Sequence, residues 1–261
     1  MQLAGKRAFV SGSTQGIGYA IARALLAEGA EVVVNGRDEA RVEAAVAALR
    51  GEVAGAAASG IVADFDEPDQ VESLLGQLGD IDILVNNVGL FEVKPFDEVT
   101  DGDWQRFFDV NVMSGVRLSR RVLPGMLARG SGRIVFISSE SGVNVPADMV
   151  HYGVSKAAML ALGNGLAKLT AGTDVTVNTV LGGPTYSDGV AQAVSQIAES
   201  QSMDVTDLKA AIIGRNQTTL LKRFIDPVEI AALVVYLASP VSAATNGAAV
   251  RADGGVLTGV L

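Results

Sequence analysis

A tyrosine and a lysine one helical turn apart are the residues whose types and spacing most directly suggest chemistry. Tyr152 and Lys156 occupy positions i and i+4, which share one face of a helix, so a phenol is expected beside an ammonium group. A neighbouring cation favours the phenolate, and lowering a phenol pKa from about 10 toward 7 requires on the order of 4 kcal/mol. The pair predicts a tyrosine that acts as a general acid and base.

A serine at the end of an apolar run lies upstream of this pair. Residues 134–137 are typical of a strand, and Ser138 and Ser139 follow directly. Because a strand end and the following helix can converge, we expect the Ser139 hydroxyl and the Tyr152 phenol to meet on one carbonyl oxygen and polarise it for hydride attack. The single histidine, His151, adjoins Tyr152 in sequence and points off another helical face, so we interpret it as incidental.

A glycine-rich turn follows the first predicted strand and leads into an amphipathic helix. It reads Ser11-Gly12-Ser13-Thr14-Gln15-Gly16-Ile17-Gly18. Glycines let the backbone approach a pyrophosphate closely, and the amides and dipole at a helix N-terminus hold its charge. The spacing G-x-x-x-G-x-G differs from the better-known G-x-G-x-x-G, and a turn that serves packing alone is the alternative. The dinucleotide site is our preferred interpretation.

The end of the second predicted strand indicates which dinucleotide is bound. Where a site that prefers NAD usually offers a carboxylate to the ribose, this chain has Asn35-Gly36-Arg37, and the first carboxylate is Asp38. Gly36 imposes no repulsion on a 2′-phosphate, and Arg37 can donate paired hydrogen bonds to it. We therefore expect NADP(H) to be preferred, with NAD(H) possible; a solvent loop capped by Arg37 is the alternative.

Two further strand ends carry candidate cofactor residues. Asp64 follows the third strand, where it is placed to accept from the adenine amino group with Phe65 beside it, although a plain turn aspartate fits as well. The fourth strand ends in Asn86-Asn87-Val88-Gly89, at the carboxyl edge where ligands bind in open parallel sheets.

Short β-rich runs alternate with segments of helical spacing along the chain. About seven strands are expected, at residues 7–11, 31–35, 60–63, 81–86, 133–138, 175–181 and 248–252. Helices are expected at residues 16–28, 39–50, 68–78, 103–128, 150–171 and 227–238. This alternation predicts an α/β fold: a Rossmann-like doubly wound parallel sheet with helices on both faces, in one domain over residues 1–261. Residues 187–221 break the pattern and predict a helical substrate cap, with a surface excursion as the alternative.

Composition excludes several function classes. Lys and Arg number 20 against 29 for Asp and Glu, a net charge of −9, so the basic footprint of a nucleic-acid binder is missing. With no cysteine and one histidine, a thiolate nucleophile, a disulfide and a metal site are not expected. The longest apolar stretches fall far short of the roughly 18–20 residues of a membrane span, and no signal peptide is recognisable, so we expect a cytoplasmic protein without membrane partners.

Taken together, these motifs resemble the short-chain dehydrogenase/reductase family of the standard single-domain type over nearly the full chain. The family's glycine-rich motif, which usually begins with Thr, matches residues 11–18, and its Asn-Asn-Ala-Gly matches residues 86–89 with Val88 in place of Ala. The resemblance implies that Tyr152 exchanges the proton and Ser139 orients the substrate carbonyl. It also implies that Lys156 binds the nicotinamide ribose and lowers the tyrosine pKa, and that Asn111 holds a proton-relay water.

The family segment Asn-x-x-x-Pro-Gly-x-x-x-Thr corresponds to residues 178–187, where Gly182 replaces the usual Pro and Ser187 the usual Thr. The resemblance implies that the Thr185 backbone meets the nicotinamide carboxamide, with Pro184 in the same segment, and that Ser187 lies near the carboxamide or the pyrophosphate. The full expected cofactor-binding set is Gly12, Ser13, Gln15, Gly16, Ile17, Gly18, Asn35, Arg37, Asp64, Phe65, Asn87, Gly89, Tyr152, Lys156, Pro184, Thr185 and Ser187.

The resemblance also implies assembly and activity. Residues 226–231 and 250–255 resemble the family's closing helix and last strand, a homotetramer or homodimer is expected, and the apolar tail at residues 256–261 fits a buried end. We predict an NADP-dependent oxidoreductase that interconverts a ketone and a secondary alcohol on a small to medium, largely apolar substrate. The residues expected to line its pocket are Phe91, Val93, Val145, Met149, Tyr186 and Val190. The alternatives are a 3-oxoacyl carrier-protein reductase, which the negative charge disfavours, and a non-catalytic dinucleotide sensor.

Overall fold

The computed structural model describes residues 3–201, 203–215 and 218–260 and contains a seven-stranded parallel sheet. The strands run in the order β3-β2-β1-β4-β5-β6-β7, and every neighbouring pair is parallel. Their bounds are β1 Arg7–Val10, β2 Glu31–Gly36, β3 Ala58–Val62, β4 Ile83–Asn86, β5 Ser131–Ser139, β6 Asp174–Gly182 and β7 Ala249–Ala252. The central strands are short runs of buried Val, Ile and Leu, as expected when both faces of a sheet are covered.

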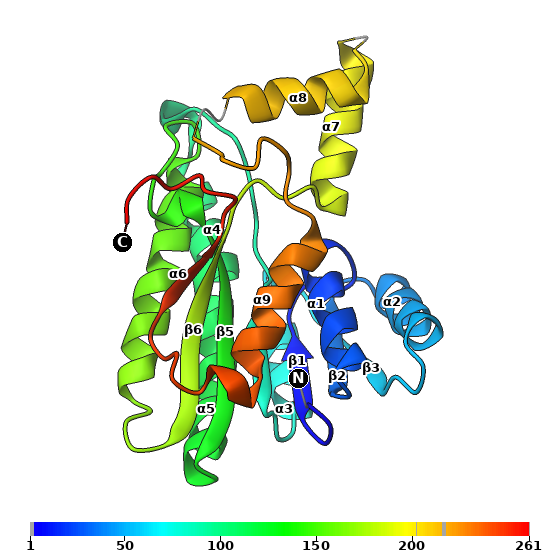
Figure 1. Ribbon diagram of the computed structural model, residues 1–261, viewed down its shortest axis with the longest axis vertical. Coiled ribbons are helices and arrows are strands. Elements are labelled where there is room, and N and C mark those ends of the chain that lie inside the picture. The colour runs from blue at the N-terminus through cyan, green and yellow to red at the C-terminus, as the bar shows by residue number, and fades with distance from the viewer. Residues whose placement is uncertain (1–2, 202, 216–217, 261) are drawn as a thin grey trace.

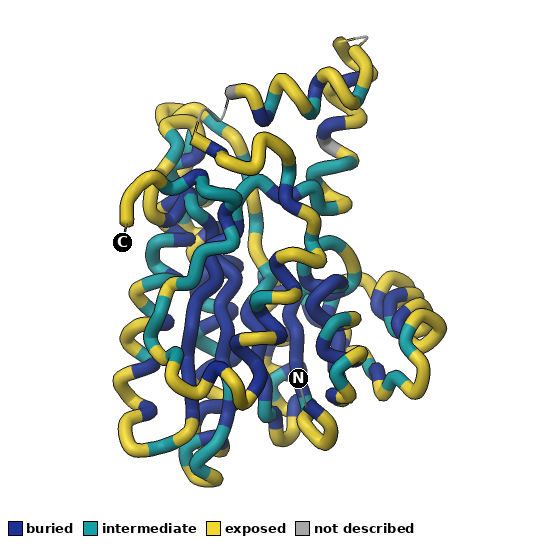
Figure 2. Tube along the Cα trace, viewed as in Figure 1, coloured by how far each residue is buried: buried dark blue, intermediate teal, exposed yellow. Residues whose placement is uncertain are grey.

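Helices cover both faces, which confirms the predicted doubly wound sheet (Figure 1). One face carries α1 (Gly16–Ala27), α2 (Glu39–Glu52) and α9 (Pro227–Ala238), and the other carries α3 (Pro68–Gln77), α5 (Ser114–Ala128) and α6 (Val150–Lys168). Alternate side chains of β1 enter the two cores, with Ala8 and Val10 on one side and Phe9 on the other. Figure 2 shows the strands as a buried layer beneath helices whose outer surfaces are exposed.

Side-chain caps fix where several helices begin. Asp38 accepts from the Arg41 backbone at the start of α2, and Thr100 and Asp103 form a capping box at the start of α4 (Asp101–Phe108). The shorter helical turns are η1 (Phe96–Glu98), η3 (Glu140–Gly142) and η4 (Pro240–Ser242). No helix among the described residues is both long enough and apolar enough to cross a membrane.

The prediction of one continuous α-helix over residues 103–128 is wrong for the middle of that segment. The segment is divided into α4, a π-helical turn η2 (Asp109–Met113) and α5. A π turn inserts an extra residue and widens the helix locally, a feature that often occurs at functional sites. Asn111 lies in this turn and is fully buried.

Two helices, α7 (Asp188–Ser200) and α8 (Val205–Arg215), lie beyond the carboxyl ends of the strands, within the stretch predicted as a cap (Figure 1). They have a small core of their own, in which Val194 and Ala198 of α7 pack against Leu208 of α8. Tyr186 and Val190 pack against the same cluster.

Candidate active site

The end of β5 and the start of α6 bring Ser139, Tyr152 and Lys156 together. Ser138 donates a hydrogen bond to the Lys156 carbonyl at 2.9 Å, and this bond holds the strand end against the helix. The Lys156 ammonium lies 5.6 Å from the centre of the Tyr152 ring and donates to the Ile137 carbonyl at 3.0 Å. A contact with the Ser139 hydroxyl lowers the pKa of Tyr152. The predicted serine, tyrosine and lysine thus face one another.

The expectation that Lys156 lowers the pKa of Tyr152 is not met in this structure. Burial raises the pKa of Tyr152 to about 12, and the Glu140 charge raises it further against the opposing contact with Ser139. Burial lowers the pKa of Lys156 to about 8. Both groups lose water on folding, and desolvation disfavours the charged form of each.

Glu140 is a residue of this site that the sequence analysis missed. The Ser139 hydroxyl donates a hydrogen bond to Glu140 Oε2 and accepts one from the Ser141 backbone at 3.1 Å. Burial raises the pKa of the Glu140 carboxyl against the lowering effect of its bonds to Ser139 and Ser141. A carboxylate directly after the predicted catalytic serine was visible in the sequence, but nothing there showed that it is partly buried.

Asn111 joins the loop after β4 to α6. Its amide accepts from the Leu90 backbone at 2.6 Å, and it donates to the Leu90 carbonyl at 3.1 Å and to Ser155 Oγ at 2.8 Å. A side chain at Gly89 would place its Cβ 3.3 Å from the Lys156 nitrogen and 3.4 Å from Asn111 Oδ1. Gly89 therefore keeps open a space that borders both residues.

His151 packs away from this cluster. It is fully buried, its ring centre lies 4.2 Å from that of Phe107 in α4, and Nε2 lies 3.3 Å from a carboxylate oxygen of Glu92. The histidine thus contributes to the packing of α6 on α4, on a different face from Lys156.

Buried polar side chains hold the glycine-rich turn in place. Ser13 donates to the Val10 carbonyl at 2.6 Å and accepts from the Asn35 backbone at 3.0 Å, while Asn35 accepts from the Gly12 backbone at 3.1 Å. Asn87 donates to the carbonyls of Ser11 and Gly12 at 3.0 and 2.9 Å. The side chains of Ser13 and Asn35 are almost completely buried, so they can support a cofactor only by shaping the backbone.

The turn has the shape that a pyrophosphate requires. Gly12 and Gly16 have φ values of 60° and 59°, which favour glycine, and a Cβ on Gly18 would lie 2.6 Å from Asn87 Nδ2. The Gln15 side chain does not cap α1, so it leaves the backbone amides of the first helical turn available to a ligand. The Gly16 amide donates to a carboxylate oxygen of Asp188 at 2.6 Å. The residues fit a dinucleotide, with Asp188 as an additional contact at the same amide.

The rim beyond β2 carries two arginines instead of a carboxylate. Asp38 is engaged as the cap of α2, with its side chain accepting from the Arg41 backbone at 2.9 Å. The Arg41 guanidinium donates to Gln15 Oε1, so a second positive charge lies beside the turn. Arg37 is exposed. The sequence analysis missed Arg41 because its closeness to Gln15 depends on how α2 packs beside the turn.

The remaining predicted cofactor residues differ in what their side chains can reach. Phe65 is 3% exposed and packs in the core, so its side chain cannot contact an adenine ring without unpacking. Asp64 accepts from the Asp66 backbone at 3.0 Å, as a turn aspartate does. In the segment after β6, the Pro184 carbonyl accepts from the Ile225 backbone at 2.8 Å, and Thr185 is 8% exposed. Ser187 adjoins the turn, 3.3 Å from a Cβ built on Gly16.

Two loops with exposed apolar side chains flank Tyr152. The Phe91 ring meets the Tyr152 ring edge-on at 5.5 Å, and Phe91 and Val145 are 63% and 39% exposed. The Lys94 backbone donates to the Asp148 carbonyl at 2.8 Å, which ties the two loops together. Of the predicted pocket residues, Val93 is also exposed, whereas Met149 is buried.

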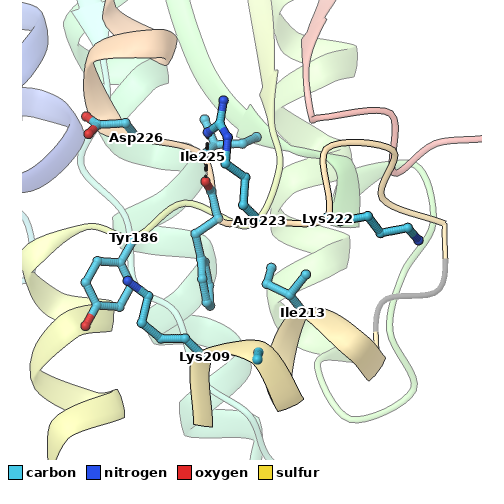
Figure 3. A pocket seen from close by; sticks show the side chains of 9 residues that line it. Tyr186, Lys209, Ile213, Lys222, Arg223, Ile225 and Asp226 are labelled. Carbon is cyan, nitrogen blue, oxygen red and sulfur yellow. Dashed lines mark hydrogen bonds between the residues drawn. The ribbon is translucent and has the colours of Figure 1, made fainter. Parts of the chain in front are cut away.

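A separate cavity of about 440 Å³ lies between α8 and the segment before α9 (Figure 3). Lys209 lies 3.7 Å from the centre of the Tyr186 ring, which packs against Phe224 at 5.4 Å. Arg223 forms an ion pair with Glu229, with a guanidinium nitrogen 2.7 Å from a carboxylate oxygen. Tyr186, predicted to line the substrate pocket, therefore lines this cavity, to which Ser139, Tyr152 and Lys156 do not contribute.

Comparison with known proteins is consistent with this geometry. Residues 6–198 match the family described as short chain dehydrogenase. The chain is 43% identical to an uncharacterised oxidoreductase, YvrD, of Bacillus subtilis (strain 168) over 98% of each chain. It is 32% identical to D-beta-hydroxybutyrate dehydrogenase of Cupriavidus necator over 97% of this chain and 98% of that one. The structure of L-sorbose reductase from Gluconobacter frateurii complexed with NADPH and L-sorbose has a TM-score of 0.93 at 29% identity, with 99% of each chain covered.

The family match spans more than half of the chain, and the relatives align over nearly their whole length. Within the described residues, no three His, Cys, Asp or Glu side chains are grouped to hold a metal ion. The convergence of Ser139, Tyr152 and Lys156 at the end of β5 agrees with the match. The chain belongs to the short-chain dehydrogenase/reductase family and is an oxidoreductase of that family.

Proposed function

We propose that this protein is an NADP-dependent oxidoreductase that interconverts a ketone and a secondary alcohol. The observation that carries the proposal is the cluster at the end of β5, where Tyr152 lies beside both Ser139 and Lys156 and where Gly89 leaves open the space next to Lys156. A hydroxyl and a phenol that can donate to one oxygen suit a carbonyl that gains negative charge. A dinucleotide sensor uses Lys156 to hold the cofactor, but it needs no Ser139 hydroxyl that donates to a carbonyl oxygen.

Each of these residues has a distinct task in the proposed reaction. Tyr152 delivers the proton to the carbonyl oxygen in reduction, and the raised pKa keeps it protonated until the substrate takes the proton. Ser139 donates a hydrogen bond to the same oxygen. Lys156, held by its bond to the Ile137 carbonyl, binds the cofactor ribose. Asn111, held by its bond to Ser155 of α6, binds a water that relays the returning proton. The nicotinamide supplies the hydride when bound.

The preference for NADP is supported by the charges at the rim. Arg37 and Arg41 offer guanidinium groups that suit a 2′-phosphate, and Asp38 is already committed to capping α2. Solved relatives include an actinorhodin polyketide ketoreductase with NADPH, at 31% identity and a TM-score of 0.87. The other dinucleotide contacts that we propose are those of the glycine-rich turn, Asn87, Gly89 and the segment from Pro184 to Ser187.

The substrate is proposed to lie between the loops that carry Phe91 and Val145. Their exposed apolar side chains flank Tyr152, which favours a substrate with an apolar part next to the carbonyl. We also propose that the protein acts as a homo-oligomer, since large apolar side chains such as Val241 and Val260 are 68% and 97% exposed in the single chain. Within the described part of the predicted tail, residues 256–260, Val256 is buried and residues 258–260 are exposed, whereas Leu261 lies outside the described residues.

The test follows NADPH and NADH absorbance with a panel of ketones, β-keto esters and a carrier-linked 3-oxoacyl thioester. We expect reduction with NADPH that is lost in Tyr152→Phe while NADPH binding is retained. Tyr236→Phe, on the outer face of α9, is the matched control and should keep full activity. NADPH binding without turnover of any carbonyl would indicate the sensor instead, and turnover of the carrier-linked substrate alone would indicate the carrier-protein reductase.

A further inference from the structure

Glu140 occupies an unusual position, because its carboxyl lies against the hydroxyl that must donate to the substrate. Ser139 donates its only proton to Glu140 Oε2, while the Ser141 backbone donates to Ser139 at 3.1 Å. A serine hydroxyl has one proton, and a carboxylate is a stronger acceptor than a ketone oxygen. With Glu140 ionised, Ser139 has no proton left for the substrate.

Protonation of Glu140 reverses the direction of this hydrogen bond. The carboxyl group then donates to Ser139 Oγ, and the serine proton is free to turn toward the substrate carbonyl. Burial favours this neutral form, since little water reaches the carboxyl to stabilise its charge. The chain Glu140 to Ser139 to carbonyl is complete only in the neutral state.

The charge of Glu140 also acts on the tyrosine. Tyr152 and Lys156 are the titratable groups at the end of α6 that packs against η3, whereas His151 faces α4. Arg133 of β5 and Asp174 of β6 lie at the ends of their strands that are far from η3. The carboxylate raises the pKa of Tyr152, so ionised Glu140 keeps the phenol protonated.

We propose that Glu140 is a positioning residue that sets the direction of the Ser139 hydrogen bond, so that the enzyme reduces carbonyls efficiently only while Glu140 is neutral. The proposal rests on the proposed function, because it assigns to Ser139 the role of donor to the substrate oxygen. Glu140 itself touches neither the substrate nor the cofactor in this scheme. No bond changes in this step except the hydrogen bonds of the two side chains.

The kinetic test compares the pH profile of kcat/KM for reduction in the parent and in Glu140→Gln. In the parent, kcat/KM should fall about tenfold per pH unit above the pKa of Glu140. A glutamine amide donates to Ser139 at every pH, so this fall should be absent in Glu140→Gln, with activity below it close to that of the parent. Glu199→Gln, at an exposed position of α7, is the matched control and should keep the parent profile. An unchanged profile in Glu140→Gln overturns the proposal.

A second measurement needs no turnover. The chain has 4 tyrosines, so the Cζ signals of ¹³C-labelled tyrosine can be resolved, and the Tyr152 signal is identified by its loss in Tyr152→Phe. In the parent this signal should move with a carboxyl titration above the usual glutamate pKa of about 4.3, and the movement should vanish in Glu140→Gln. A signal that stays flat in the parent refutes the coupling even if the enzyme is active. A titrating signal in a protein that reduces no carbonyl refutes the proposed function and leaves the coupling established.

Discussion

The choice of dinucleotide can be tested by removing the two arginines at the rim. Arg37 and Arg41 are both exposed, so each hydrogen bond to a 2′-phosphate is worth less than a buried one, and we take about 1.4 kcal/mol for each. Since 1.4 kcal/mol corresponds to a factor of ten, Arg37→Ala and Arg41→Ala should each weaken NADPH binding about tenfold. The double variant should lose somewhat less than a hundredfold, because both side chains serve one phosphate.

The assay is calorimetric titration of each variant with NADPH and with NADH. NADH lacks the 2′-phosphate, so its Kd should stay within about twofold in all three variants, which makes it an internal control. Arg120→Ala, an exposed arginine on α5 across the sheet, should change neither Kd. Equal losses for NADPH and NADH, or tighter binding of NADH by the parent, would refute the assignment of the phosphate site.

Three further variants test the site from other directions. Lys156→Met should remove activity and yet raise the free energy of unfolding at neutral pH by on the order of 3 kcal/mol, because the lysine pKa is about 8 when folded and 10.5 as its ordinary value. The unfolded chain binds more protons than the folded chain between these two pKa values, so the stability of the parent should rise with pH from 8 to 10.5. Denaturant titrations should show no such rise in Lys156→Met and the full rise in the control Lys168→Met. Gly18→Ala should abolish NADPH binding because its Cβ meets Asn87, whereas Gly76→Ala, with open space around it, should bind normally by calorimetry. Asp188→Asn should tighten NADPH and NADH equally by about fivefold, since a carboxylate at the Gly16 amide repels a pyrophosphate, and unchanged binding would show that Asp188 moves aside without cost.

Substrate specificity can be tested at two aromatic residues that lie in different places. Tyr186 faces Lys209 and the cavity between α8 and the segment before α9, whereas Phe91 faces Tyr152. Substitutions of Phe91 are therefore expected to change KM among ketones more than substitutions of Tyr186. The carbonyl panel proposed above measures both.

Residue patterns alone predicted the parallel sheet, most of its helices and the proposed catalytic residues. Continuous Val and Ile runs indicate burial on both faces of a sheet. The glycine spacing after the first strand indicates a turn that other residues rarely adopt, and Gly12 and Gly16 have positive φ values. Local chemistry therefore sufficed for these features. The spacing of Tyr152 and Lys156 needed only the period of a helix.

The tertiary structure decided the features that depend on what surrounds a side chain. Burial raises the pKa of Tyr152 above its ordinary value, and this desolvation is a property that no local sequence pattern reveals. The π turn at Asn111, the core position of Phe65 and the meeting of Arg41 with Gln15 depend on how distant elements pack. Burial also separates Glu140 from an ordinary surface glutamate, because a charge becomes sensitive to its neighbours only where water is excluded.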